Sequence, residues 1–396
     1  KTFGQQYFEK TAYVNFDNNA RMKQVFEGDL DIERLVLSIS AETGVSIEAE
    51  NTLIIFDEVQ EVPKALTSLK YFYENAPQYA IVAAGSLLGV ALHQGTSFPV
   101  GKVDFLDLYP LNFREFLCAM GEKQFVSMLD SCDTQMVTVF KTKYIERLRE
   151  YYFVGGMPEV VKDFSEKKDY NRVRAIQKNL INYYQQDFSK HAEIKLVPRL
   201  NLVWNSIPMQ LAKENKKYIY GQVREGSRAK DFELAIQWLL DCGLIHKVQR
   251  IQKPDLPLKA YIDFDSFKLF LVDIGLLIAM TDLDAKVIIE GNKIFTEFKG
   301  ALTEQYILQQ LISDVGVIPY YYSTQNSKGE IDFLVQGKTS VIPIEVKAEE
   351  NLKAKSLKAF CEKYQPSYAV RTSMSDYREQ DWMTNIPLYA IKWIEN

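Results

Sequence analysis

Residues 52–60 read TLIIFDEVQ, an apolar run that leads directly into two adjacent carboxylates, Asp57 and Glu58. A continuous apolar run of this length is typical of a strand buried on both faces of a parallel sheet. Such sheets bind ligands at the carboxyl ends of their strands, where these two acids lie. The segment therefore predicts an α/β fold and the position of a site in it.

Two adjacent acids at the end of a buried strand suit nucleotide hydrolysis. Mg²⁺ prefers oxygen ligands, and Asp57 is placed to hold it, usually through water. Hydrolysis also needs a base that polarises the attacking water, and Glu58 is the candidate. The alternative interpretation is an ordinary strand that ends at two solvated acids.

Two neighbouring apolar segments favour the nucleotide interpretation. Residues 79–84 (YAIVAA) precede Gly85 and Ser86, and the Ser86 hydroxyl is a candidate contact for the same water or phosphate. Residues 12–17 (AYVNFD) end in Asn and Asp. Helical stretches separate the three strands, and this alternation predicts a doubly wound parallel sheet.

None of the 19 glycines begins the G-x-x-x-x-G-K-[ST] pattern of a phosphate-binding loop. The nearest segment, residues 95–103 (GTSFPVGKV), has five residues between its glycines and Val103 where a hydroxyl should be. The chain opens at KTFG, with no Met and no first strand. We therefore expect the first strand of the sheet and its P-loop to lie upstream of Lys1.

Composition narrows the class of protein. With 396 residues, 47% hydrophobic and 25% charged, the chain is long enough for two or three globular domains. A net charge of −5 argues against a surface coated in basic residues for bulk nucleic-acid binding, although a local basic patch is compatible with it. Four scattered cysteines and three isolated histidines argue against zinc sites and Cys–His catalysis. The apolar stretches are too short for a bilayer, and we expect a cytoplasmic protein that does not bind membranes.

Four regions are expected along the chain. The first closes with a strand at 103–108 and a helix that begins after the N-cap Asn112. The four regions are an N-terminally incomplete ATPase domain at 1–125, a helical region at 126–215, a winged-helix-like domain at 216–285 and a second α/β domain at 286–396.

The region 216–285 combines a helix with a hairpin. An amphipathic helix is expected at 229–242, followed by strands at 244–248 and near 260–262. This order is typical of helix-turn-helix relatives that bind DNA, and the same shape often serves only for protein contacts. Basic residues on the helix expected at 170–188 indicate a solvated face, with a nucleic-acid surface as the alternative.

A second carboxylate constellation occupies the last 110 residues. Glu304 lies on an expected helix, Asp332 on the first strand of an expected hairpin, and Glu345 with Lys347 on the second. Glu345 and Lys347 are two residues apart and so share one face of their strand. Carboxylates that hold Mg²⁺ and a lysine that stabilises charge are the groups that phosphodiester hydrolysis needs. The alternative is a hairpin with an exposed Glu–Lys pair.

Seven short pieces, taken in order, resemble one family. They are LIIFDEVQ (53–60), AGS (84–86), VGKV (100–103), YPLNFREFL (109–117), FKLFLVDIGLL (267–277), KGALTE (299–304), and Asp332 with the EVK of 345–347. The chain resembles the bacterial and archaeal AAA-type P-loop ATPases that carry a C-terminal domain of unknown function with a restriction-endonuclease-like core. The resemblance covers essentially the whole chain.

The resemblance implies an ATP site in which Mg²⁺ is the cofactor. Asp57 would lie near the metal, Glu58 would be the catalytic base, and Ser86 and Lys102 would lie near the phosphates. The fold implied is a P-loop-type sheet without its first strand, then a winged-helix region and a restriction-endonuclease-like domain.

The implied nuclease-like core has four catalytic candidates, Glu304, Asp332, Glu345 and Lys347, of which Asp332 and Glu345 would be metal ligands. Three functions follow as hypotheses. The first is an ATPase that switches a module associated with DNA or RNA, and the second is a Mg²⁺-dependent nuclease regulated by ATP. The third is a non-enzymatic scaffold with degenerate sites that binds a protein partner. The sequence leaves the oligomeric state and the preferred nucleic acid open.

Overall fold

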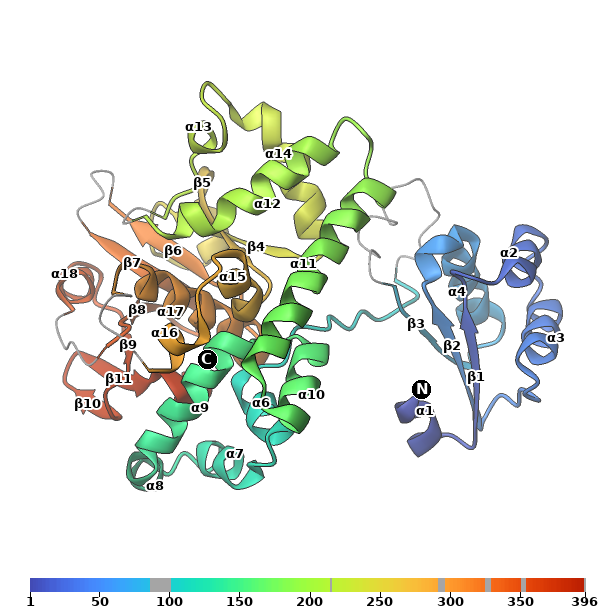
Figure 1. Cartoon of the computed structure of the whole chain (residues 1–396), viewed down its shortest axis with the longest axis horizontal. Coiled ribbons are helices and arrows are strands. Elements are labelled where there is room, and N and C mark those ends of the chain that lie inside the picture. The colour runs from blue at the N-terminus through green and yellow to red at the C-terminus, as the bar shows by residue number, and fades with distance from the viewer. Residues whose placement is uncertain (86–100, 214–215, 291–295, 325–328, 350–353, 395–396) are drawn as a thin grey trace. The chain divides into compact units, whose positions relative to one another are not determined.

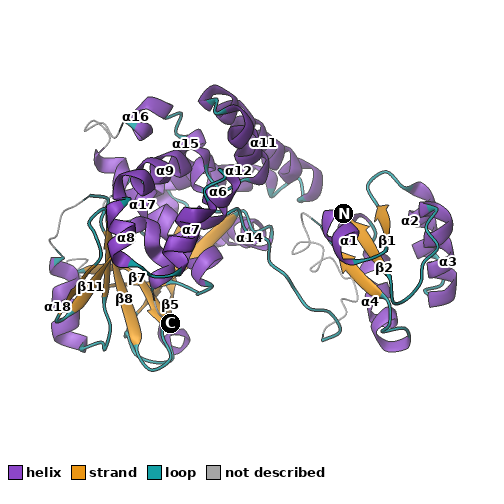
Figure 2. Ribbon diagram, turned by 90° about the horizontal axis from the view of Figure 1, so that it is seen from below, coloured by secondary structure: helices purple, strands orange, loops and turns teal. Residues whose placement is uncertain are grey.

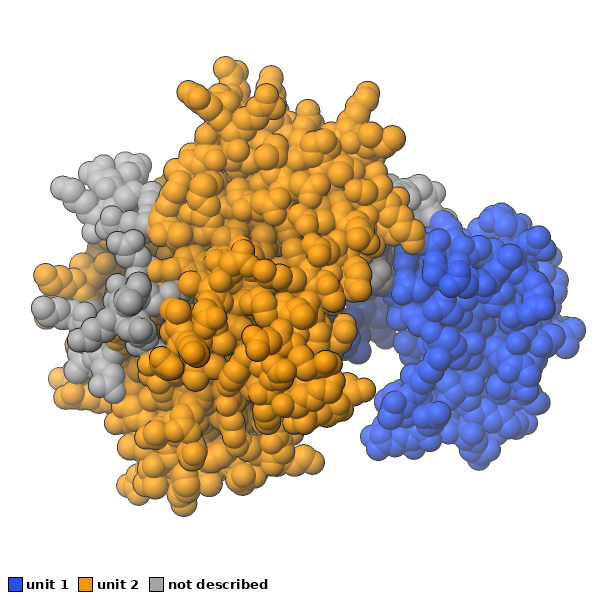
Figure 3. Space-filling view, viewed as in Figure 1, with its two compact units in different colours: residues 1–108, 238–243 blue, residues 109–237, 244–396 orange. Residues whose placement is uncertain are grey.

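The structure is a computed structural model that describes residues 1–85, 101–213, 216–290, 296–324, 329–349 and 354–394. The chain divides into two compact units, shown in blue and orange in Figure 3. Unit 1 comprises residues 1–108 and 238–243, and unit 2 comprises residues 109–237 and 244–396. Ser86, one of the predicted site residues, lies outside the described residues.

Unit 1 is built on a parallel sheet of order β1-β2-β3, labelled in Figure 1. Its elements are α1 (Thr2–Tyr7), β1 (Lys10–Asn15), α2 (Ala20–Glu27), α3 (Ile32–Thr43), β2 (Thr52–Asp57), α4 (Pro63–Asn75) and β3 (Ala80–Ala83). The three predicted strands are thus present, parallel and separated by helices. The apolar run of residues 52–60 forms the middle strand, and its first five residues are buried.

The core of unit 1 explains why these strands form. Residues at alternate positions along β1 and β2, including Val14 and Phe56, pack together with residues of α2, α3 and α4. At its centre, Phe16, Phe26 and Phe56 meet edge to face with ring centroids 5.3–5.6 Å apart. This burial of one sheet face beneath helices leaves the carboxyl end of β2 beside a cavity on the other face.

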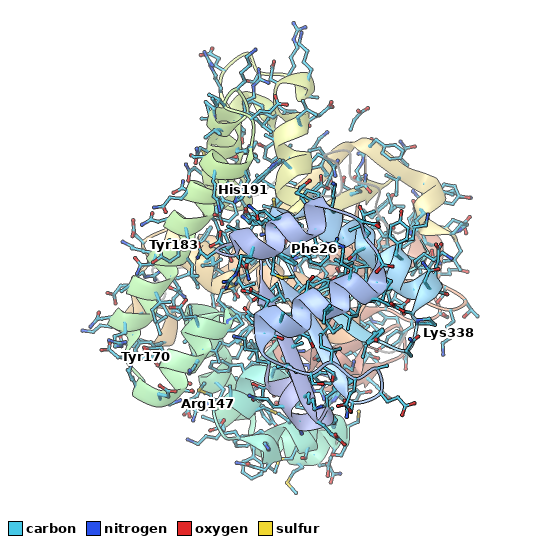
Figure 4. All side chains as sticks on the ribbon, turned by 90° about the vertical axis from the view of Figure 1, so that its right-hand side faces the viewer. Phe26, Arg147, Tyr170, Tyr183, His191 and Lys338 are labelled. Carbon is cyan, nitrogen blue, oxygen red and sulfur yellow. The ribbon has the colours of Figure 1, made fainter. Side chains whose placement is uncertain are left out.

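Unit 2 holds most of the helices (Figure 2). They are α6 (Phe113–Ala119), α7 (Lys123–Asp130), α8 (Thr134–Val139), α9 (Lys141–Val154), α10 (Pro158–Lys167), α11 (Tyr170–His191), α12 (Val197–Leu211), α13 (Tyr220–Val223), α14 (Ala229–Asp241, which continues into unit 1), α15 (Ile274–Met280), α16 (Ala285–Ile289), α17 (Thr296–Gln310) and α18 (Lys355–Tyr364). Figure 4 shows Tyr170, Tyr183 and His191 spaced along the longest of them, α11.

An eight-stranded mixed sheet organises unit 2, in the order β10-β11-β9-β8-β7-β6-β4-β5. Its strands are β4 (Ile245–Ile251), β5 (Ile262–Leu271), β6 (Tyr320–Ser323), β7 (Glu330–Gln336), β8 (Val341–Val346), β9 (Val370–Ser373), β10 (Arg378–Gln380) and β11 (Met383–Pro387). The predicted hairpin at 330–347 is confirmed as β7 and β8, which pair antiparallel. Both α17 and α18 pack against β8 (Figure 2).

The hairpin predicted at 244–262 is also present, but it is not the wing of a separate small domain. Its strands β4 and β5 pair antiparallel, and β4 pairs in parallel with β6. The second strand begins at Ile262, because residues 258–261 form a short 3-10 helix. Strand pairing therefore joins the regions expected at 216–285 and 286–396 in one sheet.

Local signals near the start of unit 2 are partly confirmed. Asn112 caps α6 as predicted: its side-chain oxygen accepts a hydrogen bond from the Glu115 amide, and the Glu115 carboxylate accepts one from the Asn112 amide, which forms a capping box. The strand predicted at 103–108 is wrong, because these residues are not in a strand. A strand is held by hydrogen bonds to a neighbour, and in the described part of unit 1 the strands that pair are β1, β2 and β3 alone.

A buried carboxylate ties three segments of unit 2 together. Asp273 is fully buried, and its side chain caps α15 by accepting a 3.0 Å hydrogen bond from the Leu276 amide. It also accepts hydrogen bonds from the Gly156 amide (2.6 Å) and from Nε2 of Gln309 (3.3 Å). A side chain at Gly155, where φ is +74°, would collide with this carboxylate. The Gly-Gly turn after α9 is therefore shaped around Asp273.

Two further observations bear on the class of protein. Among the described residues, none of the helices combines the length and apolarity needed to span a bilayer. All four cysteines are free thiols, two of them exposed.

Candidate functional site

The two adjacent acids lie at the carboxyl end of the middle strand of unit 1. Asp57 is the last residue of β2 and pairs in register with Asn15, the last residue of β1. The chain then turns sharply, because Glu58 adopts the left-handed conformation with φ 53° and ψ 43°. A non-glycine residue in this region is uncommon, and such strain concentrates at functional sites.

Hydrogen bonds rather than ion pairs orient Asp57. The Tyr13 hydroxyl donates to Oδ2 over 2.5 Å, and the Glu58 amide donates to Oδ1 over 3.1 Å. The hydrogen bond to Asp57 raises the pKa of Tyr13, so the phenol stays protonated as the donor. Within the described residues neither Asp57 nor Glu58 forms a salt bridge. No lysine or arginine of the described ranges therefore pairs with either carboxyl group.

Glu58 is oriented by a nearby amide. Nε2 of Gln60 donates a 2.6 Å hydrogen bond to Oε2 of Glu58. Oε1 of Gln60 packs closely against Gly85, and the Cβ of any larger residue at position 85 would collide with this atom. Oε1 of Gln60 is buried and has no hydrogen-bond partner among the described residues. The geometry fixes one carboxylate oxygen of Glu58 and leaves the other available.

A cavity of about 370 Å³ opens beside Asp57. It is lined by Lys1, Phe3, Tyr13, Leu53, Ile55, Asp57, Val82 and Ala84. The lining is mainly apolar with one carboxylate, a mixture typical of small-molecule sites, and the volume is within their usual range. The Lys1 ammonium lies 3.5 Å from the centroid of the Tyr13 ring.

These residues fit Mg²⁺ but supply only part of a nucleotide site. Asp57 offers hard oxygen atoms at the end of a strand, held by a second layer of hydrogen bonds of the kind that orients metal ligands. The chain contains no glycine-rich phosphate loop, so contacts to the phosphates are not defined by its described residues.

Lys102 does not lie with the other predicted residues. Its ammonium is 3.6 Å from Oε1 of Glu74 and 4.8 Å from the ring centroid of Tyr73. Both partners belong to the last turn of α4, roughly 16 Å along the helix from Pro63. α4 begins just after the carboxyl end of β2, where the phosphates were expected. Lys102 therefore lies near the opposite end of α4 and not beside the phosphates as predicted.

The four predicted C-terminal residues come together in unit 2, but lysines that the sequence did not reveal join them. We name the carboxylate cluster after its four acids, Glu304, Glu330, Asp332 and Glu345. Glu304 on α17 forms ion pairs with Lys216, which precedes α13, and with Lys268 of β5, whose Nζ lies 3.8 Å from Oε2 of Glu304. The fully buried Lys268 also pairs with Glu330 at the start of β7.

The two predicted strand residues Glu345 and Lys347 contact each other. Nζ of Lys347 lies 2.6 Å from Oε1 of Glu345, which confirms that they share a face. Oδ2 of Asp332 accepts a 2.7 Å hydrogen bond from the amide of Val346, which locks β7 to the end of β8. The hairpin therefore brings Asp332 and Glu345 together as expected.

Protonation differs among the acids of this cluster. Burial raises the pKa of Asp332 well above its usual value, and the nearby Glu304 and Glu345 raise it further. Burial also acts to raise the pKa of Glu304, but its two lysine partners outweigh burial and the pKa is lowered. These opposite directions favour the proton on Asp332 and the negative charge on Glu304.

This arrangement does not fit the Mg²⁺ site predicted from Asp332 and Glu345. Ammonium groups already pair with Glu304, Glu330 and Glu345, and Oδ2 of Asp332 accepts a hydrogen bond from the backbone. In the described part of the chain, no group of three or more His, Cys, Asp or Glu side chains is arranged to hold a metal ion. A metal needs several deprotonated oxygens that face one point.

Sequence reasoning missed five residues at the two sites, and two of them carried a usable signal. Tyr13 lies two residues before Asn15 and therefore on the same face of β1. Lys268 interrupts the apolar run FKLFLV, and a lone lysine in a buried strand indicates a buried ion pair. Nothing comparable marked Gln60, Lys216 or Glu330, whose partners are set by the tertiary structure.

Three family models match successive parts of the chain. Residues 1–117 match the family described as AAA domain, residues 145–287 match a domain of unknown function (DUF8612), and residues 299–391 match another (DUF4143). No curated protein sequence matches the chain. Among solved structures, the chain is similar to the Walker-type ATPase PABY2304 of Pyrococcus abyssi, with 12% identity and a TM-score of 0.39 over 69% of this chain and 84% of that one. The segment that contains Asp57 and Glu58 is thus similar in sequence to AAA domains.

Proposed function

We propose that the protein binds ATP with Mg²⁺ in unit 1 and hydrolyses it. The observation that carries this proposal is the position of Asp57 and Glu58. They follow the middle strand of a parallel sheet, and Asp57 lines a cavity and pairs with no lysine or arginine in the part of the chain that the structure describes. The match of residues 1–117 to AAA domains supports the same function.

Each residue has a distinct role in this proposal. Bound ATP with Mg²⁺ supplies the phosphoanhydride bond that is cleaved. Asp57 holds the metal through its carboxylate, and Tyr13 keeps that carboxylate in one orientation. Glu58 accepts a proton from the attacking water through its oxygen that Gln60 does not contact. Gln60 and Tyr13 are positioning residues.

The test is the rate of phosphate release from ATP by the full-length protein and its Glu58→Gln variant. Removal of a general base lowers kcat by at least about 100-fold, while binding of a fluorescent ATP analogue is retained. Glu48→Gln is the matched control, because Glu48 pairs with Lys10 at the other end of the sheet and should leave the rate unchanged. Equal rates for the protein and Glu58→Gln would remove the base from the proposal.

For unit 2 we propose a restriction-endonuclease-like fold without the metal chemistry predicted from sequence. Support comes from the order of its elements, in which α17 precedes the antiparallel strands β6, β7 and β8, and α18 leads to β9 parallel to β8. The structure gives no support to nucleic-acid cleavage as a second function, because Lys347 pairs with Glu345 and Asp332 accepts a backbone hydrogen bond from Val346. DNA binding by residues 216–285 stays a prediction.

A further inference from the structure

Two groups of basic residues are candidates for a nucleic-acid surface, and the structure distinguishes between them. On α11, Arg172 forms an ion pair with Asp163 at 2.8 Å, and Lys178 forms one with Asp282 at 2.7 Å. A basic side chain that is paired within its own chain must give up that contact before it can bind a phosphate. These residues of α11 are therefore poorly placed to bind nucleic acid.

The basic residues of the turn between α13 and α14 differ in this respect. Arg224, Arg228 and Lys230 are exposed, and none of them forms an ion pair within the part of the chain that the structure describes. Glu225 is the one acid in residues 224–230. Figure 1 shows this turn at the edge of unit 2, beside the label α13. Neighbouring like charges repel one another, so the three cations suit an anionic partner rather than the stability of the fold.

Backbone contacts hold the turn in one shape. The Ser227 amide donates a 3.1 Å hydrogen bond to the Arg224 carbonyl, and the Arg228 amide donates one of 2.8 Å to Oδ2 of Asp231. A Cβ added at Gly226 would meet no atom within 4 Å, so the space around the turn is open. The three basic side chains can therefore be approached closely by a large partner.

The aromatic residues beside the turn indicate which kind of nucleic acid fits. Tyr218 and Phe232 are buried, and Tyr220 stacks on Phe232 with ring centroids 6.5 Å apart. Single strands and RNA loops are bound largely by stacking their bases on exposed aromatic side chains. Because these rings pack within the protein, the turn suits a duplex whose phosphates bind arginine and lysine.

We propose that Arg224, Arg228 and Lys230 bind the phosphate backbone of duplex DNA and do not select its sequence. The proposal narrows the DNA-binding prediction for residues 216–285 to three side chains. It is independent of ATP hydrolysis in unit 1.

The exposed face of α14 explains the lack of sequence selection. A helix that reads base edges lies in the major groove, between two rows of phosphates. Glu233 and Leu234 are exposed on α14, and phosphates repel the charge of Glu233. The turn therefore contacts the DNA, and the helix face stays outside the groove.

The experiment measures the fluorescence anisotropy of a labelled duplex titrated with the full-length protein in the absence of nucleotide. Duplexes of several unrelated sequences, each about 20 base pairs long, are compared with single strands of the same length. The test variants are Arg224→Gln, Arg228→Gln and Lys230→Gln, singly and combined. Circular dichroism verifies that each variant is folded.

A matched control removes the same charge elsewhere in unit 2. It combines Lys355→Gln, Lys358→Gln and Lys363→Gln, three exposed lysines of α18. Because net charge changes equally in both triple variants, a difference between them reports the position of the charges.

We expect every duplex to bind with a Kd of about 1–100 µM near physiological salt. Three phosphate contacts predict a slope of about −2.7 for log K against log salt, so affinity should fall about 40-fold between about 50 mM and 200 mM salt. Each single variant should reduce that slope by about 1, equally for all sequences. The combined variant should lose binding, and the α18 control should retain it.

Four results would each overturn the proposal. The first is no binding of duplex DNA at about 50 mM salt. The second is an equal loss of binding in the two triple variants. A single strand that binds more tightly than the duplex would refute the choice of partner. A preference of more than about 10-fold for one duplex would refute the absence of sequence selection.

Discussion

The hydroxyl of Tyr13 donates a 2.5 Å hydrogen bond to Oδ2 of Asp57, across adjacent parallel strands. The two residues are 44 positions apart in the sequence, and the register of β1 on β2 brings them together. The bond fixes the carboxylate that follows the central strand while the side chain still lines a cavity. Such second-layer hydrogen bonds orient metal ligands and are nearly as important as the ligands themselves.

Tyr13→Phe should therefore impair ATP hydrolysis without unfolding unit 1. Loss of the hydroxyl removes one restraint on Asp57, and such losses typically cost about 10- to 100-fold in metal affinity or activity. The measurement is the Mg²⁺ concentration that gives half-maximal ATP hydrolysis, which we expect to rise. Tyr71→Phe on the exposed side of α4 is the control. An unchanged Mg²⁺ dependence in Tyr13→Phe would show that this bond is only structural.

Gly85→Ala should slow the proton transfer to Glu58 rather than weaken nucleotide binding. The added Cβ collides with Oε1 of Gln60, whose Nε2 orients Glu58. We expect kcat to fall by about 10-fold with little change in KM, because general-base catalysis depends on placement within hydrogen-bond reach. Gly28→Ala is the control, since its φ of −77° suits alanine and a Cβ there makes only ordinary van der Waals contact. A rise in KM alone would contradict this role of Gly85.

His246 should make unit 2 sensitive to acid. Burial lowers the pKa of His246 to about 4, against about 6.5 in an unfolded chain. The folded state thus favours the neutral imidazole, which packs beside the Tyr109 ring with centroids 6.4 Å apart. The folded state is therefore fully favoured by the neutral His246 above pH 6.5, and this stabilisation is lost as the pH falls towards 4.

The measurement for this prediction is urea unfolding followed by circular dichroism at several pH values. Between about pH 7 and pH 4, the protein should lose about 1–2 kcal/mol more of its unfolding free energy than His246→Gln, which cannot gain the proton. Parallel pH profiles for the two proteins would assign the acid sensitivity to other groups.

Asp273→Ala should destabilise unit 2 strongly. The substitution removes the cap of α15 and leaves the buried Gly156 amide without its acceptor. Together these losses should cost about 2–4 kcal/mol in the free energy of unfolding. Asp284→Ala removes a comparable cap from α16 at an exposed position and should cost only about 0.5–1 kcal/mol. Equal effects in thermal unfolding would mean that the buried contacts of Asp273 contribute little.

Local patterns of the sequence predicted much of the secondary structure. The apolar run at 52–57 forms a buried strand, Asn112 caps a helix, and the amphipathic helix expected at 229–242 forms as α14. Each of these depends on neighbours in the sequence, through periodicity or capping. The strand predicted at 103–108 does not form, because an alternating pattern produces a strand only where a neighbouring strand pairs with it through hydrogen bonds.

The sequence by itself determined which strands are buried, their order with the helices, and the two places where carboxylates gather. Only the tertiary structure decided what surrounds those carboxylates. Hydrogen-bond donors and a cavity lie beside Asp57, whereas Lys216 and Lys268 form ion pairs with Glu304. The reason is physical: the free energy of a carboxylate depends on which charges and dipoles lie within a few ångströms of it. Residues distant in the sequence supply those groups when the sheets form.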